Sequence, residues 1–156
     1  MLDEKSLEIL KILQEKARIP NVDISRKVNL APSAVLERIR KLEKQGYIDG
    51  YEVRLNPERF SKSLIAFIEL SVEWSKLPKN FSSLLSNISG VQEVHFISGQ
   101  DCYFIKMRVA NSVELGNILK EKILPHQGVI SSCTKTVLNT YKETAQIPIS
   151  QISTTD

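Results

Sequence analysis

Apolar side chains recur every three or four residues through the first part of the chain, and polar residues fill the positions between them. One set is Ile24 and Val28, and a second is Val35, Ile39 and Leu42. This spacing puts each set on one face of a helix. The pattern predicts a short helix around residues 24–28 and a longer one over 32–44. An earlier apolar set, including Ile9 and Leu13, predicts a supporting helix capped by Asp3.

The residues between the two predicted helices suit a tight turn. Asn29 tolerates the left-handed backbone that such a turn needs, and Leu30 supplies an apolar plug. Pro32 fits a first helical position, and Gly46 fits a left-handed cap after the second helix. Pro20 is expected to end the supporting helix and Asn21 to cap the next one. The whole pattern is that of a helix-turn-helix, whose second helix enters the DNA major groove.

The outward face of the 32–44 helix predicts the DNA contacts. Cations there suit phosphates, whereas Ser33, Ala34, Glu37 and Arg40 are placed to touch base edges. Arg38 lies nearer the edge of the buried stripe. The predicted DNA-binding residues are Arg26, Lys27, Ser33, Ala34, Glu37, Arg38, Arg40, Lys41 and Lys44. The alternative for any such helix is a solvated basic face, and the turn chemistry in the same window favours DNA binding.

Polar and apolar residues alternate over 47–55 around an Asp-Gly turn signal, which predicts a short strand or wing. Asn56-Pro57 then interrupts the pattern. The predicted organisation is a helix-turn-helix domain over 1–55, a hinge over 56–63, a second domain over 64–142 and a tail over 143–156. The tail is expected to be loose, apart from the small apolar group at 147–149.

Period-two alternation dominates the second half and predicts strands over 64–74, 91–97, 102–109 and 129–138. Helical spacing predicts a helix opened by Pro78 and another, capped by Asn111 or Ser112, with Val113 on its apolar face. Trp74 is placed on the apolar face of the first strand. The order strand, helix, strand, strand, helix, strand predicts an α+β fold, a ferredoxin-like βαββαβ domain with two helices on one face of an antiparallel sheet.

The first strand carries Ile65 and Phe67 on its second face, so this face of the sheet is half apolar. A domain of this size buries little core, and an open apolar sheet face needs a partner. We therefore expect a homodimer or a larger assembly.

Charge and composition exclude several classes of function but do not identify the function. The net charge of +3 is too small to indicate DNA binding, but residues 26–44 hold six cations against Glu37 and Glu43. No apolar run is long enough to cross a membrane and no secretory leader is present, so a cytoplasmic protein is expected. His95 and His126 lack ligand-like neighbours, and Cys102 and Cys133 form no metal or disulfide pattern. No cofactor motif or catalytic constellation is found, so the chain is not expected to be an enzyme.

An ordered run of motifs resembles the leucine-responsive regulatory protein/AsnC (Lrp/AsnC) family of transcription regulators over residues 2–142. The motifs are Leu2-Asp3, Ile9-Leu10, Ala17-Arg18-Ile19, residues 36–43 and 45–48, Gly50-Tyr51, Leu55-Asn56-Pro57, Ser98-Gly99, Tyr103 and Gly128-Val129. The resemblance implies a DNA-binding domain hinged to a ferredoxin-like effector domain. It also implies dimers that assemble further, commonly into octamers, and amino-acid effectors bound between subunits near the turn before the third strand.

Two positions depart from the family pattern. Ala31 stands where the family usually has a capping Ser, and Ser33 is expected to compensate in part. Cys102 takes the place of the usual acid of the effector turn, and Asp101 is one residue early. The expected effector residues are Gly99, Gln100, Asp101, Cys102, Ser132 and Thr134.

Two rivals to the effector-responsive regulator stay open. The first is a regulator whose second domain only oligomerises and binds no ligand, and Cys102 in the acid's place argues for it. The second is a ligand-binding or enzymatic domain that carries a helical appendage, and the basic face of the 32–44 helix argues against it.

Overall fold

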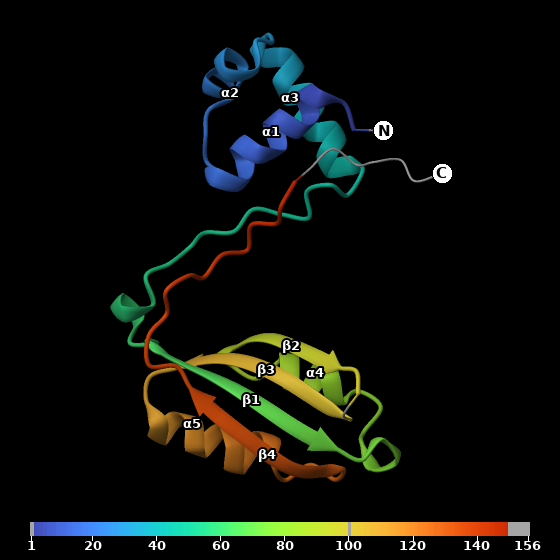
Figure 1. Cartoon of the computed structure of the whole chain (residues 1–156), viewed down its shortest axis with the longest axis vertical. Coiled ribbons are helices and arrows are strands. Elements are labelled where there is room, and N and C mark those ends of the chain that lie inside the picture. The colour runs from blue at the N-terminus through green and yellow to red at the C-terminus, as the bar shows by residue number, and fades with distance from the viewer. Residues whose placement is uncertain (1, 100, 150–156) are drawn as a thin grey trace. The chain divides into compact units, whose positions relative to one another are not determined.

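The computed structural model describes residues 2–99 and 101–149 (Figure 1). Contacts divide the chain into two compact units. The first contains the residues up to Arg54 together with those from Lys142 onward, and the second contains residues 55–141. The chain therefore passes between the units twice, at Arg54–Leu55 and at Tyr141–Lys142.

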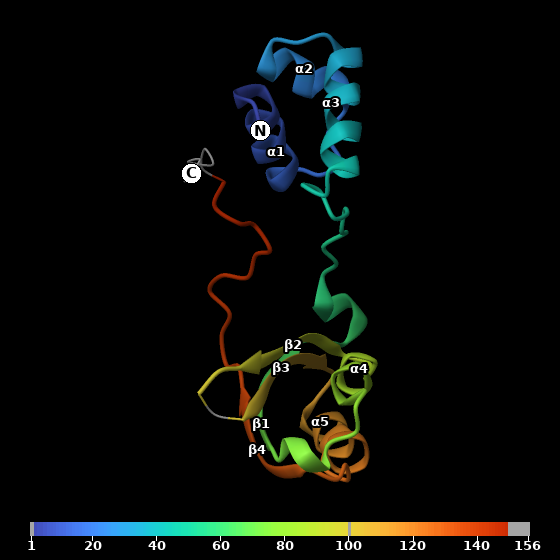
Figure 2. The same cartoon turned by 90° about the vertical axis from the view of Figure 1, so that its right-hand side faces the viewer.

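Three helices form the first unit: α1 (Glu4–Glu15), α2 (Asn21–Val28) and α3 (Pro32–Lys44) (Figure 2). Their predicted apolar stripes meet in one core that includes Ile9, Ile24, Val28 and Val35. Asp3 caps α1 as predicted, because its carboxylate accepts a hydrogen bond from the Ser6 backbone N–H at 2.8 Å. The prediction that Asn21 caps α2 is wrong. Pro20 fixes the backbone before this helix, so Asn21 is already its first residue.

The turn between α2 and α3 has the predicted chemistry. Asn29 adopts the left-handed conformation at φ 54° and ends α2, and Pro32 is the first residue of α3. Gly46 follows α3 at φ 73°. The Tyr47 backbone N–H then bonds back to the Leu42 carbonyl at 2.9 Å, which closes the helix as a Schellman motif.

No strand forms over 47–55, so the strand is the wrong one of the two forms, strand or wing, that were predicted there. Alternation decides which side of an extended segment is apolar, but a strand also needs a neighbour that accepts its backbone hydrogen bonds. The described part of the chain supplies no such neighbour here, and the Val53 side chain is 83% exposed. Tyr51 is held differently, because its hydroxyl donates to the Glu43 carboxylate at 2.9 Å.

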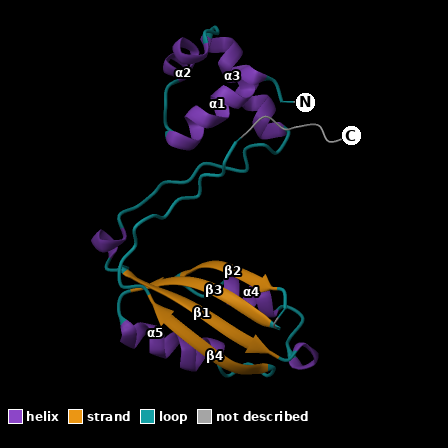
Figure 3. Ribbon diagram, in the orientation of Figure 1, coloured by secondary structure: helices purple, strands orange, loops and turns teal. Residues whose placement is uncertain are grey.

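The second unit is an antiparallel sheet in the order β2–β3–β1–β4, the predicted ferredoxin-like arrangement (Figure 3). Its strands are β1 (Leu64–Val72), β2 (Val91–Ile97), β3 (Cys102–Val109) and β4 (Val129–Thr136). A 3₁₀ helix at Pro57–Phe60 precedes β1. β1 and β3 are the central strands, so their backbone groups are paired on both sides.

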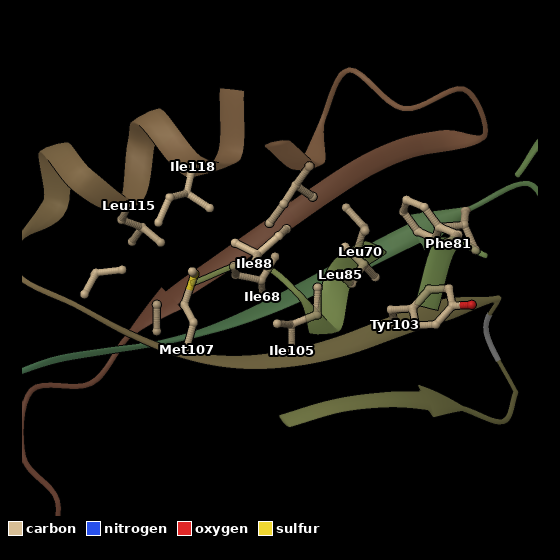
Figure 4. Packing of buried hydrophobic residues seen from close by; sticks show 14 residues of the cluster. Ile68, Leu70, Phe81, Leu85, Ile88, Tyr103, Ile105, Met107, Leu115 and Ile118 are labelled. Atoms are coloured by element: carbon tan, nitrogen blue, oxygen red, sulfur yellow. The ribbon is translucent and has the colours of Figure 1, made fainter. Parts of the chain in front are cut away.

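Helices α4 (Phe81–Ser86) and α5 (Ser112–Ile118) cover one face of this sheet, and a π-helical turn at Leu119–Ile123 extends α5. Ile68, Ile105 and Met107 are fully buried between sheet and helices (Figure 4). Asn111 caps α5 through its side chain, as predicted.

Two side chains of this unit that were predicted on apolar faces are exposed in the structure. The pairing of β1 shifts after Ser71 and the strand ends at Val72, so Trp74 falls in a 3₁₀ turn and is 48% exposed. Val113 is 69% exposed because Leu115 and Ile118 form the buried stripe of α5 and Val113 lies on the opposite side of the helix.

Candidate DNA-binding and effector sites

The outward face of α3 carries most of the predicted DNA-binding residues. Val35, Ile39 and Leu42 are buried, so the opposite face is solvent-exposed. The exposed side chains there are Ser33, Glu37, Arg40, Lys41 and Lys44, with Ala34 partly exposed beside them. Within residues 2–99 and 101–149, the side chains of Arg40, Lys41 and Lys44 make no ion pair or hydrogen bond. These three cations are therefore available to an external anion.

The start of α3 has no side-chain cap, because Ala31 occupies the cap position. The expected compensation by Ser33 is wrong, since no side chain in the described part of the chain bonds to this end of the helix. Its first backbone N–H groups thus keep their capacity to bind a phosphate oxygen. In a helix-turn-helix the same end of the second helix approaches the DNA.

Arg38 points away from the outward face. Its guanidinium pairs with the Asp3 carboxylate and donates to the Ser6 hydroxyl at 3.2 Å. Hydrogen bonds from Ser6 and Arg38 hold the pKa of the Asp3 carboxyl well below its usual range. Asp3 therefore has two partners, the start of its own helix and a side chain of α3. This arrangement makes Arg38 a tie between α1 and α3.

The basic residues of α2 differ from one another. Arg26 lies within 3.6 Å of the Asp23 carboxylate, but its side chain is 76% exposed. Lys27 is exposed and, among the described residues, its side chain has no charged partner. Glu43 on α3 is engaged by Tyr51, and burial together with this hydrogen bond raises the pKa of Tyr51 to about 12.

The predicted effector turn joins β2 to β3. Gly99 adopts φ 93°, and apart from its chain neighbours no described residue has an atom within 4 Å of an added Cβ, so the backbone angle explains the glycine. Gln100 lies outside the described residues. The Asp101 carboxylate accepts a hydrogen bond from the Trp74 indole N–H at 3.3 Å. Cys102 is 3% exposed.

The remaining effector candidates lie on the other side of the sheet from Cys102. Ser132 is paired with Leu70 and Thr134 with Ile68, so both belong to the helix-covered side. Cys102 is paired with Ser71, on the opposite side. Paired residues share a face and neighbours along a strand alternate. One copy of the chain therefore does not bring Cys102 together with the two hydroxyls.

An aromatic cluster beside this turn was missed by the sequence analysis. Trp74 contacts the rings of Phe96 and Tyr103, with centroids 4.7 Å and 5.9 Å apart, and Tyr103 contacts Phe81. Burial raises the pKa of Tyr103. A depression of about 390 Å³ lies against this cluster and includes Lys79 and Ser82 in its lining. The aromatic residues come from four separate elements, so no local motif marks them.

The helix-free face of the sheet carries a second aromatic contact. Phe67 on β1 and Phe104 on β3 stack with their ring centroids 5.6 Å apart. Ion pairs flank them, between Glu93 and Lys106 at 3.0 Å and between Glu69 and Lys135 at 3.8 Å. An apolar centre with a charged margin is typical of a protein–protein interface.

Other kinds of site find no support in the described ranges, 2–99 and 101–149. No group of three metal-ligating side chains occurs there, and no helix there is long and apolar enough to cross a membrane.

Two family models match the chain. Residues 2–49 match a winged helix-turn-helix DNA-binding domain, and residues 65–147 match the Lrp/AsnC ligand binding domain.

Full-length relatives agree with both matches. The chain is 36% identical over 145 residues to the leucine-responsive regulatory protein of Haemophilus influenzae, covering 92% of this chain and 87% of the relative. It is 34% identical over 150 residues to that of Escherichia coli K12, covering 95% and 92%.

Among solved structures, a transcriptional regulator from Neisseria meningitidis in complex with L-Met has a TM-score of 0.88 at 28% identity. That alignment covers 95% of this chain and 97% of the other.

Proposed function

The chain belongs to the Lrp/AsnC family of DNA-binding transcription regulators with a ligand-binding domain, and we propose that it reads double-stranded DNA through α3. Its curated relatives are transcription regulators and not enzymes. One observation carries the proposal: Arg40, Lys41 and Lys44 have no ion-pair partner among the described residues, and they lie on the exposed face of a helix whose other face is buried.

The proposal assigns different roles to the exposed residues of α2 and α3. Lys27, Lys41 and Lys44 neutralise phosphates, as does Arg26 when its long contact to Asp23 gives way. Ser33, Ala34, Glu37 and Arg40 lie nearest the base edges. Arg is the residue most suited to guanine, because its guanidinium can donate two hydrogen bonds to one base. Arg38 is removed from the DNA contacts, since Asp3 already neutralises it.

A homodimer is proposed for the second unit, formed over the helix-free face of the sheet. The Phe67–Phe104 stack supplies an apolar centre, and the ion pairs of Glu69 and Glu93 supply a charged margin. Two copies related by a two-fold axis present two α3 helices to a pseudo-palindromic DNA site. Assembly beyond the dimer, such as an octamer, is the family expectation.

An amino acid is the proposed effector, bound between subunits beside Gly99–Cys102. The Neisseria meningitidis regulator was solved with L-Met, which supports this chemical class. Cys102 lies on the helix-free side of the sheet, which forms the proposed dimer, whereas Ser132 and Thr134 lie on the helix-covered side. These two hydroxyls therefore take part only if a copy beyond the dimer supplies them. The rival is a regulator without an effector, favoured by a thiol where the family has an acid.

The DNA-binding proposal is tested by the salt dependence of binding. The Arg40→Ala/Lys41→Ala/Lys44→Ala variant is compared with a Lys11→Ala/Lys16→Ala/Arg18→Ala variant, which removes the same charge from exposed positions in or next to α1. Fluorescence anisotropy on duplexes selected from genomic fragments by the wild type gives the affinities. We expect the α3 variant to lose most of its affinity and to show a slope of log K against log salt smaller by about three. Equal losses of DNA affinity in both variants would show that net charge, and not the outward face of α3, determines binding.

The effector proposal is tested by calorimetry with the twenty amino acids on wild type, Cys102→Asp and Gly99→Val. We expect Cys102→Asp to bind one amino acid more tightly, because a carboxylate can accept hydrogen bonds from its ammonium group. Gly99→Val is expected to abolish binding, since a β-branched residue does not adopt the left-handed backbone found at Gly99. Absence of heat in wild type and in Cys102→Asp would favour the effector-free rival.

A further inference from the structure

The C-terminal residues Gln146 and Ile147 bond to the end of helix α1. The Gln14 side-chain amide donates to the Ile147 carbonyl at 3.1 Å and accepts from the Ile147 backbone N–H at 2.9 Å. The Gln146 side chain donates to the Gln14 backbone carbonyl at 3.0 Å. These three hydrogen bonds join residues 132 or 133 positions apart in the chain.

The chemistry of this contact is complementary at each atom. The Gln14 amide offers one donor and one acceptor, so it pairs with the Ile147 backbone as a neighbouring strand would. The last four carbonyls of a helix lack partners within the helix, and the Gln14 carbonyl is one of them because α1 ends at Glu15. The Gln146 amide supplies the missing donor. The Ile147 side chain is 68% exposed, so polar bonds hold the segment more than apolar burial does.

We propose that the segment 142–149 is a strap that closes on α1 and gives the ligand-binding unit a second connection to the DNA-binding unit. Strand β4 belongs to the second unit, whereas the residues from Lys142 onward belong to the first. A change at β4 can therefore reach α1 through the strap as well as through the hinge after Arg54. The three bonds lie at exposed positions, and each net hydrogen bond contributes little in water, so the strap opens and closes readily.

Amide hydrogen exchange of the full chain, followed by NMR, tests the strap. The Ile147 amide is expected to exchange at least about tenfold faster in Gln14→Ala than in wild type, since the change removes two of the three hydrogen bonds and one net hydrogen bond alone corresponds to about that factor. Ala favours helix more than Gln does, so this change does not loosen α1 by itself. Gln146→Ala is expected to give a smaller increase, and Gln127→Ala, an exposed glutamine of the second unit, none. Equal exchange rates of the Ile147 amide in wild type and Gln14→Ala would overturn the proposal that the segment closes on α1.

A mixing experiment decides whose α1 the strap binds. Isotope-labelled wild type is equilibrated with an excess of unlabelled Gln14→Ala protein, and only the labelled Ile147 amide is observed. A strap within one chain keeps its protection in the mixture, which is the expected result. Protection that falls with the share of Gln14→Ala protein would show that the segment binds a second copy, and would overturn the strap as a connection between the two units of one chain.

Discussion

Replacing Asp3 with Asn separates the two contacts of this carboxylate. Asn caps helices about as well as Asp, so the hydrogen bond from the Ser6 backbone N–H is retained. The ion pair to Arg38 is lost, and with it the charged tie between α1 and α3. The side chains of Arg38 and Asp3 are 33% and 53% exposed, so solvent screens the pair and its loss costs about 1 kcal/mol. Asp3→Ala removes the cap as well and is expected to cost about 2 kcal/mol.

The pH dependence of stability follows from the lowered pKa of Asp3. A carboxyl whose pKa is lower in the folded than in the unfolded state stabilises the fold above its unfolded pKa, near 4. This contribution disappears as the pH falls through the lower folded pKa. Urea unfolding of wild type and Asp3→Asn should therefore differ by about 1 kcal/mol at pH 7, and the difference should shrink steadily below about pH 4. If the difference in unfolding free energy between wild type and Asp3→Asn stays constant down to pH 2, it does not come from the ionised Asp3 carboxylate.

DNA binding by the same variants distinguishes a tie from a DNA contact. If Asp3 acted only as a negative charge near DNA, Asp3→Asn would tighten binding. If the Asp3–Arg38 pair instead joins α1 to α3, Asp3→Asn should not tighten DNA binding, because α3 loses a contact that positions it. Arg38→Ala should leave the slope of log K against log salt unchanged, whereas Lys41→Ala should reduce it by about one. A slope reduced by about one in Arg38→Ala would refute this assignment and restore Arg38 to the phosphate contacts.

Two further predictions concern the second unit. Gly116→Ala should raise its stability by about 0.5–1 kcal/mol, because an added Cβ meets open space within a helix, whereas Gly90→Ala should lower it by more than about 2 kcal/mol. The Gly90 Cβ would lie 2.5 Å from the Arg108 carbonyl at φ 91°, and thermal unfolding of both variants measures the contrast. Phe67→Ala should weaken self-association at least tenfold in sedimentation experiments, and Phe60→Ala, on an exposed 3₁₀ helix, should not. Equal dissociation constants for the two Phe variants would exclude this sheet face as the interface.

Local chemistry made the three helices of the first unit and several of their ends predictable from the sequence, although the caps expected at the starts of α2 and α3 were wrong. Asn29 and Gly46 adopt left-handed backbone, and Pro32 opens α3, because each residue's own backbone preference decides the matter within a few positions. Period-two alternation located the strands of the sheet, because it too is a local pattern: successive side chains of a strand point to opposite faces. The segment 47–55 shows the limit, since its alternation is real but a strand also depends on a partner segment.

Contacts distant in sequence account for what the sequence did not predict. Arg38 was assigned to DNA because its charge is visible, but its partner Asp3 lies 35 positions earlier. Ser132 and Thr134 were grouped with the effector turn, and only the pairing of β4 with β1 reveals the side of the sheet from which they project. The bonds between Gln14 and Ile147 leave no periodic signal in the sequence, because a single glutamine side chain and the backbone of one residue form them.

Base preference of α3 variants tests the central claim most directly. Random duplexes are selected with wild type, Arg40→Ala and Lys44→Ala, and the selected sequences are compared. We predict that Arg40→Ala loses its preference at one base position per half-site, corresponding to about 1–3 kcal/mol, whereas Lys44→Ala selects the wild-type sequence with weaker binding throughout. An unchanged preference at every position in Arg40→Ala would contradict the reading of DNA by this face of α3.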